Sequence, residues 1–300
     1  MRVAITGGTG FIGRHLAGDL ADRGHQVVVI ARGLYTRGTG IPSHNNITFV
    51  QANVTDSAAL AQAFAGCDAV VHCAGTSQDK SQTLQQVHVQ GAESAVTAAW
   101  QAGVQKFVLV SYLRARPVKA SDYLTTKWEG EEIVRKSGLN YTILKAGLVY
   151  GPGDHLLHNL GNLLRKLPVF ATVGMRERTV RLVAVEDLVS VIRAALTDDR
   201  LANQTVAVLG PEEFPFSSAA RRIARAMGNS FLLVLPFPVF AQRLLAWISS
   251  HMPKPLVSTS QVQMLADGIS LPLPDSKMLP DDLVPSTRFT QEQIRKGLPD

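Results

Sequence analysis

Short apolar runs alternate with longer amphipathic stretches through the first half of the chain. The runs cover residues 2–6, 26–31, 47–52, 69–74, 106–111 and 141–146. Each run is continuous and does not alternate between apolar and polar positions, which is typical of strands that are buried on both faces of a parallel sheet. The first half of the chain therefore predicts six parallel strands.

The stretches between these runs predict helices over residues 11–23, 58–65, 83–102 and 123–136. A glycine stands where each helix would end, at Gly24, Gly66, Gly103 and Gly138. Glycine is favoured there because it readily adopts the left-handed conformation of a helix cap. Repeated strand and helix units predict a Rossmann-type, doubly wound parallel α/β sheet, which binds ligands at the carboxyl ends of its strands.

The pattern loosens after residue 150. A further strand, a helix that begins near Glu186 and another strand are expected to return to the main sheet. The predicted larger domain comprises residues 1–150 together with 181–210, and the smaller, discontinuous C-terminal lobe comprises 151–180 together with 211–300. A chain of 300 residues is long enough for this arrangement.

The composition is that of a globular protein, with 46% apolar and 18% charged residues. The N-terminus lacks the apolar region of a signal peptide, and no apolar run is long enough to span a membrane, so we expect a cytoplasmic protein. The net charge of +6 comes from scattered residues without interleaved aromatics, so no nucleic-acid partner is predicted. The spacing of Cys67 and Cys73 matches no zinc or redox motif, and no metal site is predicted.

A glycine-rich turn follows the first predicted strand directly. Gly7, Gly10 and Gly13 are spaced for a tight turn, a close backbone approach to a pyrophosphate and a close contact of helix with sheet. The turn also opens a predicted helix, whose N-terminus favours phosphate. This position between strand and helix predicts a dinucleotide site.

The end of the second strand bears on which dinucleotide binds. An acidic residue there would bond the ribose 2'-hydroxyl of NAD(H), but the chain has Ala31 and Arg32. A guanidinium suits a 2'-phosphate, so we favour NADP(H) over NAD(H). A solvated loop arginine is the alternative, and Arg14 and Arg37 are weaker candidates for the same phosphate.

The stretch "SDYLTTKWEGEE" places Tyr123 four residues before Lys127 at the start of a predicted helix, so both side chains can meet over one spot. A phenol near its free pKa of about 10 is a poor base at neutral pH, and a nearby ammonium favours the phenolate. The pair is therefore a candidate proton-transfer device.

Together these residues resemble the extended or atypical branch of the short-chain dehydrogenase/reductase superfamily, with its NAD-dependent epimerases and dehydratases. The resemblance rests on "TGGTGFIG" at the first turn, "AVVHCAG" on the fourth strand, "YLTTK", and "GLVYGPGD" after the sixth strand. Residues 87–111 and 123–154 look most like the subfamily of the nucleotide-binding accessory subunit of respiratory complex I and its bacterial relatives. The likeness covers residues 1 to about 230.

The resemblance implies roles for the matched residues. Tyr123 would be the general acid/base, and Lys127 would bond the nicotinamide ribose and lower the pKa of the tyrosine. A serine, here Ser111, would polarise the substrate carbonyl. The implied cofactor contacts, in addition to Arg32 and Lys127, are Gly7, Thr9, Gly10, Phe11, Ile12 and Gly13 in the turn, Asn53 and Val54 at the adenine, Ala74 and Gly75 at the ribose and phosphates, and Ala146 and Val149 at the nicotinamide.

The sequence departs from the family pattern at three places. Ser111 is followed by Tyr112 and Leu113 and not by a second serine, so its hydroxyl could serve backbone bonding instead. Tyr112 could then donate to the substrate in its place, or no residue does. Lys145 and Ala146 stand where relatives commonly have Arg-Pro, and His88 stands where many have a buried asparagine. We interpret His88 as a satisfied structural residue.

The sequence defines the substrate and partners less closely than the cofactor. Two basic stretches, with Arg114, Arg116 and Lys119 in one and Arg176, Arg178 and Arg181 in the other, suit either an anionic small-molecule substrate or a solvated basic surface. The segment 231–252 is apolar on nearly every helical face, which indicates burial in the smaller lobe, or docking on a membrane surface or a protein. Such a face is compatible with a homodimer without requiring one.

Two functions remain open. In the first, the protein is an NADP(H)-dependent oxidoreductase, or an epimerase or dehydratase that uses hydride transfer, with Tyr123 and Lys127 as the working pair. In the second, it is a non-catalytic NADP(H)-binding accessory or assembly protein of a membrane-associated complex. The intact pair favours the first function, whereas the absent second serine and the subfamily likeness favour the other.

Overall fold

An eight-stranded sheet forms the centre of the first of two units into which the chain folds. The computed structural model describes residues 1–33, 40–41, 43–76, 81–173, 177–229, 231–237 and 270–298. The first unit comprises Met1–Ala146, Val189–Ala207 and Pro274–Leu283, and the second comprises Gly147–Leu188, Val208–Leu273 and Val284–Asp300.

The strand order of this sheet is β14-β11-β6-β5-β4-β1-β2-β3. The bounds are β1 (Arg2–Thr6), β2 (Gln26–Ala31), β3 (Ile47–Gln51), β4 (Ala69–His72), β5 (Lys106–Tyr112), β6 (Tyr141–Ala146), β11 (Gln204–Val208) and β14 (Lys277–Met278). The pairings of β1 with β2 and with β4 are parallel, as are those of β5 with β4 and β6. The predicted Rossmann-type sheet is thus confirmed.

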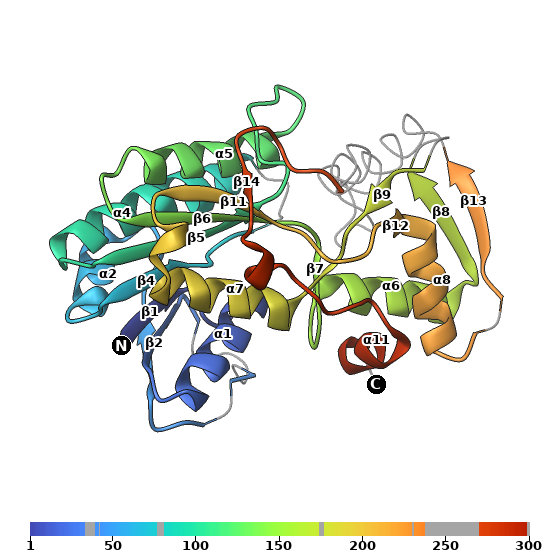
Figure 1. The fold of residues 1–300 in the computed structure, drawn as a ribbon, viewed down its shortest axis with the longest axis horizontal. Coiled ribbons are helices and arrows are strands. Elements are labelled where there is room, and N and C mark those ends of the chain that lie inside the picture. Colours follow the sequence, from blue (N-terminus) through green and yellow to red (C-terminus); the bar gives the residue numbers. More distant parts are fainter. Residues whose placement is uncertain are drawn as a thin grey trace. The chain divides into compact units, whose positions relative to one another are not determined.

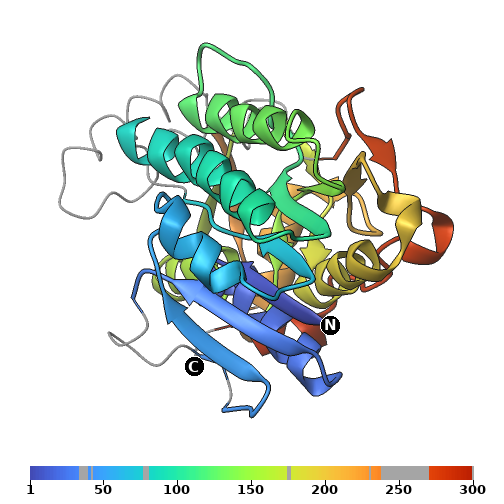
Figure 2. The same cartoon turned by 90° about the vertical axis from the view of Figure 1, so that its left-hand side faces the viewer.

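Helices cover both faces of the sheet, which is why its strands are continuously apolar. Figures 1 and 2 show α2 (Ser57–Phe64), α4 (Gly91–Gln101) and α5 (Asp122–Arg135) over one face, and α1 (Phe11–Asp22) and α7 (Val185–Thr197) over the other. The core beneath α2, α4 and α5 includes Phe64, Phe107 and Ile143, each with no exposed surface.

The glycines predicted to end the helices do so. Gly24, Gly66, Gly103 and Gly138 have φ values of 82°, 68°, 67° and 72°, in the left-handed region that favours glycine. At the other end of α5, the Ser121 hydroxyl accepts a hydrogen bond from the Leu124 N–H at 3.4 Å. This cap starts the helix at Asp122 and places Tyr123 in its first turn.

The long helix predicted before β5 is not a uniform α-helix. It consists of α3 (Ser81–Leu84), a π-helical segment at Gln85–Gln90, and α4. A Cβ added to Gly130 of α5 would lie 2.6 Å from the His88 carbonyl oxygen, so α5 packs directly on the π-helical segment. Such segments are frequently found at functional sites.

The segment 274–283 joins the first unit, although the sequence predicted a place for it in the smaller lobe. Val206 and Ala207 of β11 pair with Lys277 and Met278 of β14, which therefore forms an edge of the main sheet. A two-residue strand carries no periodicity, so sequence patterns do not reveal it.

The second unit contains α6 (His155–Lys166), α8 (Phe216–Ala226), α11 (Gln291–Gly297) and three small sheets. The sheets pair β7 (Val149–Tyr150) with β10 (Val183–Ala184), β8 (Val169–Val173) with β13 (Leu233–Phe237), and β9 (Thr179–Val180) with β12 (Phe214–Pro215). Most of the apolar segment 231–252 lies outside the described residues. In the part of the chain that is described, no helix has the length and apolarity needed to cross a bilayer.

Candidate functional site

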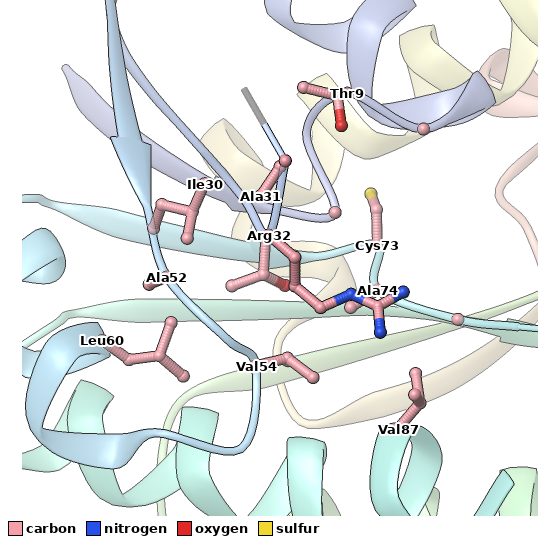
Figure 3. Close-up of a pocket in the computed structure, with 15 residues that line it drawn as sticks. Thr9, Ile30, Ala31, Arg32, Ala52, Val54, Leu60, Cys73, Ala74 and Val87 are labelled. Carbon is pink, nitrogen blue, oxygen red and sulfur yellow. The ribbon is translucent and has the colours of Figure 1, made fainter. Parts of the chain in front are cut away.

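A cavity of about 300 Å³ lies in the first unit at the carboxyl ends of β1, β2 and β4. Because β1 lies between β2 and β4, the order of the strands reverses at this point, where open α/β sheets bind their ligands. Figure 3 shows the lining, which consists of Thr6, Gly7, Thr9, Gly10, Ile30, Ala31, Arg32, Gly33, Ala52, Val54, Leu60, Cys73, Ala74, Gly75 and Val87.

The glycine turn forms the floor of this cavity. Gly7 has φ 66°, and a Cβ on it would lie 2.8 Å from the Ala74 Cα. A Cβ on Gly13 would lie 2.5 Å from the Gly7 carbonyl oxygen. Both positions therefore require glycine. The α1 helix begins after Gly10 without a side-chain cap or an acidic residue in its first turn, so its N–H groups suit a pyrophosphate.

The end of β2 contributes Arg32 to the lining, and none of the lining residues is acidic. The Gln51 amide donates a hydrogen bond to the Arg32 carbonyl at 3.1 Å, which anchors the backbone and leaves the side chain exposed. Figure 3 shows its guanidinium extending over the cavity. The Arg14 guanidinium instead lies 5.9 Å from the Phe11 ring, and Arg37 lies outside the described residues.

The predicted cofactor residues divide into two groups. Gly7, Thr9, Gly10, Arg32, Val54, Ala74 and Gly75 line the cavity, whereas Phe11, Ile12, Gly13, Asn53, Lys127, Ala146 and Val149 do not. Asn53 is exposed, and its Oδ1 accepts a hydrogen bond from the Thr55 N–H at 3.3 Å. The Ala146 carbonyl accepts the Leu113 N–H at 2.8 Å. Val149 belongs to the second unit.

Apolar walls of the cavity were missed from the sequence. Ile30, Ala52, Leu60 and Val87 line it beside the predicted residues. Their residue types are the same as those of core residues. Only Ile30 could have been predicted, from its place at the end of β2. Their apolar side chains suit the flat faces of an adenine ring.

Lys127 lies at the rim of the cavity. Its ammonium donates a hydrogen bond to the Val110 carbonyl at 3.2 Å. A Cβ added to the lining residue Gly75 would lie 3.7 Å from Lys127 Nζ. Burial lowers the pKa of Lys127, although the charge of Glu131 opposes this shift.

Tyr123 packs among aromatic rings one turn before Lys127. Its ring lies 5.5 Å from the His88 ring and 5.8 Å from the Tyr112 ring, edge-on to both. Burial raises the pKa of Tyr123 to about 12. The resemblance implied a pKa lowered by Lys127, but desolvation dominates here, and the phenol holds its proton at neutral pH.

His88 joins the cavity to α5. Its Nε2 accepts a hydrogen bond from the Thr76 N–H at 3.2 Å, and its Nδ1 lies 3.0 Å from the Thr126 hydroxyl. That hydroxyl donates to the Asp122 carbonyl at 2.8 Å, which leaves it to accept from Nδ1–H. Burial, and then the charge of Lys127, lower the pKa of His88 to about 2, so the ring is neutral. A satisfied histidine is consistent with our structural interpretation.

Two further titratable groups near Lys127 are also uncharged at neutral pH. Burial, and then the Lys127 charge, lower the pKa of His72 to about 3, and its Nδ1 lies 2.9 Å from the Thr6 hydroxyl. Burial raises the pKa of the Cys73 thiol to about 12, against the effect of Lys127. Lys127 therefore supplies the positive charge in this group of side chains.

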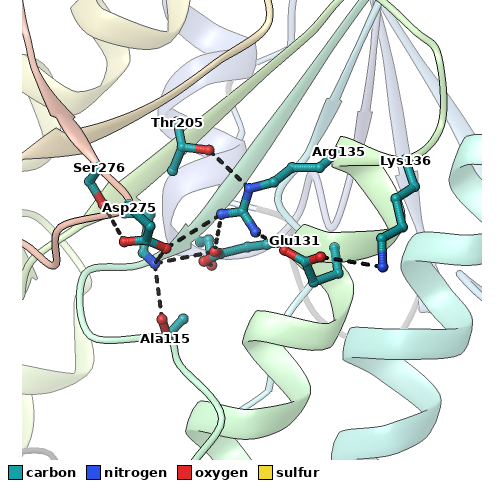
Figure 4. Close-up of polar contacts among 10 residues, drawn as sticks. Ala115, Glu131, Arg135, Lys136, Thr205, Asp275 and Ser276 are labelled. Carbon is teal, nitrogen blue, oxygen red and sulfur yellow. Dashed lines mark hydrogen bonds and ion pairs between the residues drawn. The ribbon is translucent and has the colours of Figure 1, made fainter.

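Ser111, the third predicted catalytic residue, is turned into the core. Its hydroxyl donates a hydrogen bond of 2.5 Å to Glu131, and both residues are buried. Glu131 in turn accepts from Arg135 at 2.7 Å and pairs with Lys145 at 3.2 Å (Figure 4). The Ser111 hydroxyl is thus engaged by a carboxylate, not by the backbone groups that its strand-end position suggested.

Comparisons with known proteins point to an NAD(P)H-binding family. A family described as NAD(P)H-binding matches residues 7–155. The ceramide reductase of Caulobacter vibrioides is 31% identical over 242 residues, which are 79% of this chain and 74% of that protein. The mitochondrial NADH-ubiquinone oxidoreductase 40 kDa subunit of Neurospora crassa is 26% identical over 226 residues, 74% of this chain and 59% of that one.

Among solved structures, MoeE5 in complex with UDP-glucuronic acid and NAD is similar with a TM-score of 0.75 at 17% identity, over 99% of this chain and 97% of its own. This likeness concerns the fold alone. The sheet and its glycine turn define an NAD(P)-binding protein of the oxidoreductase and epimerase type. The chain belongs to the extended short-chain dehydrogenase/reductase family, as its 31% identity to the ceramide reductase and its match to the NAD(P)H-binding family show.

Proposed function

We propose that the protein is an NADP(H)-dependent oxidoreductase that reduces a carbonyl group, with Tyr123 as proton donor and Lys127 as the residue that binds the nicotinamide ribose. The observation that carries the proposal is the position of Lys127 Nζ, 3.7 Å from a Cβ built on the cavity residue Gly75. Tyr123 precedes Lys127 by one helical turn, so its hydroxyl belongs to the same side of α5.

The residues present suit a pyridine dinucleotide. The close glycine approaches and the uncapped start of α1 accommodate a pyrophosphate, and Arg32 at the end of β2 suits a 2'-phosphate. We therefore keep NADP(H) as the preferred cofactor. Thr9, Val54, Ala74 and Gly75 would complete the contacts from the same cavity.

The protonated state of Tyr123 suits the reductive direction of the proposed reaction. NADPH, when bound, supplies a hydride to the carbonyl carbon. The substrate oxygen then gains a proton, and Tyr123, whose pKa is raised to about 12 by burial, holds one to give. Lys127 would offset the resulting phenolate charge. His88 would keep α5 and the Gly75–Thr76 backbone together through its two ring nitrogens.

The substrate is proposed only as a class. Arg114, Arg116 and Lys119 follow β5 in the first unit and favour an anionic group near the strand ends. In the second unit, Arg181 Nε donates to the Gly210 carbonyl at 2.8 Å, Arg178 is exposed, and Arg176 lies outside the described residues. By analogy with the ceramide reductase we propose that this chain catalyses a reduction, and we do not carry over the substrate of that protein.

A second candidate function is a non-catalytic NADP(H)-binding accessory or assembly protein. The hydrogen bond from Ser111 to Glu131 favours it, because that hydroxyl is then unable to polarise a substrate. The likeness to the 40 kDa subunit favours it as well. In that case NADP(H) would stabilise the fold, and Tyr123 and Lys127 would be retained for binding.

The test begins with titration of the purified protein with NADPH and NADH, in which nicotinamide fluorescence reports binding. NADPH oxidation is then measured with a panel of quinones, aldehydes and sugar nucleotides. We expect Tyr123→Phe to lower turnover by about 100-fold or more and to leave NADPH affinity unchanged. Tyr141→Phe, which removes a hydroxyl outside the cavity, is the matched control.

The outcomes separate the two functions. Turnover that depends on Tyr123 supports the reductase. Unchanged turnover in Tyr123→Phe would remove this residue from the mechanism. Tight NADPH binding without turnover of any compound would favour the accessory protein.

A further inference from the structure

The second unit carries an apolar sheet face that the cofactor site does not use. Strands β8 and β13 are parallel, with Leu233 beside Val169 and Leu235 beside Ala171. All four residues are exposed. Paired residues, and residues two positions apart, point to the same side of a sheet, so these four share one face.

The opposite side of β8 is covered. Phe170 is 7% exposed, and its ring lies 5.7 Å from that of Phe216 at the start of α8. Thr172 is 6% exposed. Figure 1 shows β13 beside β8 with α8 along one side of the pair. The face with Val169 and Leu233 therefore points away from α8.

More apolar side chains extend this face at the start of both strands. The Leu233 N–H donates a hydrogen bond to the Pro168 carbonyl at 2.9 Å. Phe231 precedes Leu233 by two positions, as Leu167 precedes Val169, so both continue the alternation of these strands. Phe231 and Leu167 are 67% and 57% exposed. We call the set formed by Leu167, Val169, Ala171, Phe231, Leu233 and Leu235 the β8–β13 face.

The helix that leads into this face ends with two cations. Arg165 and Lys166 are exposed and directly precede Leu167. The arginines of α8 do not contribute, because α8 lies on the other side of β8 and its Arg222 is paired with Glu212 at 3.2 Å. An exposed apolar surface edged by cations is complementary to anionic lipid headgroups over acyl chains.

A protein that adds a strand fits this surface less well. Pro236 in β13 has no N–H to donate, and Pro168 directly precedes β8. Prolines at these positions block the hydrogen-bond ladder that strand addition requires. A lipid surface needs no such ladder.

We propose that the β8–β13 face docks on the surface of a membrane that contains anionic phospholipid. The leucines and Phe231 enter the boundary of headgroups and acyl chains, and Lys166 and Arg165 contact the phosphates. The attachment is peripheral, and it does not depend on whether the protein turns over a substrate.

Sedimentation of the full chain with lipid vesicles tests this proposal. We expect binding to vesicles of phosphatidylcholine with about one-third phosphatidylglycerol, and weak binding to phosphatidylcholine alone. Leu233→Asp with Leu235→Asp should lower the partition coefficient by about tenfold or more. Phe49→Asp with Met278→Asp makes the same charge change at residues that are 40% and 56% exposed in the first unit, and should retain most of the binding.

Folding is checked by thermal unfolding and by NADPH titration, because the cofactor cavity lies in the first unit. If the leucine variant does not fold, Lys166→Glu provides the test, with an expected loss of about fivefold or more in binding and no change in melting temperature. Absence of vesicle binding by the wild type, or binding that these variants leave intact, would overturn the proposal. The proposal would also be overturned if the wild type is a dimer that does not bind vesicles and if the leucine variant is a monomer, since the face would then join two copies.

Discussion

Lys145 Nζ lies 3.2 Å from the Glu131 carboxylate, and both side chains are fully buried. The ammonium also donates to Asp275 and to the Ala115 carbonyl, each at 2.9 Å (Figure 4). One side chain on β6 therefore ties α5, the loop after β5 and the segment before β14 to each other. The same Glu131 engages Ser111, so this network and the orientation of the serine are linked.

We expect Lys145→Met to lower the free energy of unfolding by about 3 kcal/mol, because it leaves the Asp275 carboxylate and the Ala115 carbonyl without their buried donor. Urea unfolding measures the change. Lys136→Met is the matched control, since Lys136 pairs with Glu132 of the same helix at 3.4 Å but is 78% exposed. The control should cost less than about 1 kcal/mol. Equal, small losses in both variants would contradict the structural role of Lys145.

The neutral histidines predict a dependence of stability on pH. Burial lowers the folded-state pKa of His88 to about 2 and that of His72 to about 3. Unfolded histidine titrates near 6.5, so below this pH the unfolded chain binds more protons than the folded one, and stability falls by about 1.4 kcal/mol per pH unit for each histidine.

We therefore expect His88→Asn to reduce this slope by about half between pH 6.5 and 5. The measurement is urea unfolding at several pH values. His158→Asn, at an exposed position of α6, should retain the wild-type slope. A slope unchanged by His88→Asn would show that this ring is protonated in the folded protein.

Arg32 should discriminate between the two dinucleotides. We expect Arg32→Ala to weaken NADPH binding by about tenfold or more and NADH binding by less than about twofold, because the 2'-phosphate alone loses its partner. Nicotinamide fluorescence titrations give both affinities. Arg23→Ala, which removes an exposed arginine paired with Asp19, is the control. Equal weakening of both cofactors would exclude a contact with the 2'-phosphate.

Local patterns predicted most of the first unit. The six apolar runs correspond to β1 to β6, and the four cap glycines end α1, α2, α4 and α5. Each of these features depends on a few consecutive residues, so it is visible along the chain. The tight turn with Gly7 and Gly13 was predicted for the same reason, because a turn between a strand and a helix is a local structure.

The partners of polar side chains were not predictable in this way. Ser111 bonds a residue 20 positions away, and Lys145 bonds Asp275 across 130 positions. Neither contact follows from spacing, because it depends on how α5, β6 and the segment before β14 pack. The π-helical segment that carries His88 also differs from the continuous helix predicted by apolar periodicity.

The sequence by itself determined the Rossmann-type sheet, the dinucleotide turn and the positions of Tyr123 and Lys127 on one side of a helix. These features are encoded by periodicity and by the conformational freedom of glycine within short segments. Only the tertiary structure decided that Ser111 is bound by Glu131, that burial keeps Tyr123 protonated and His88 neutral, and that the β8–β13 face is exposed. Desolvation and long-range pairing depend on what packs around a group, and that information is spread over the whole chain.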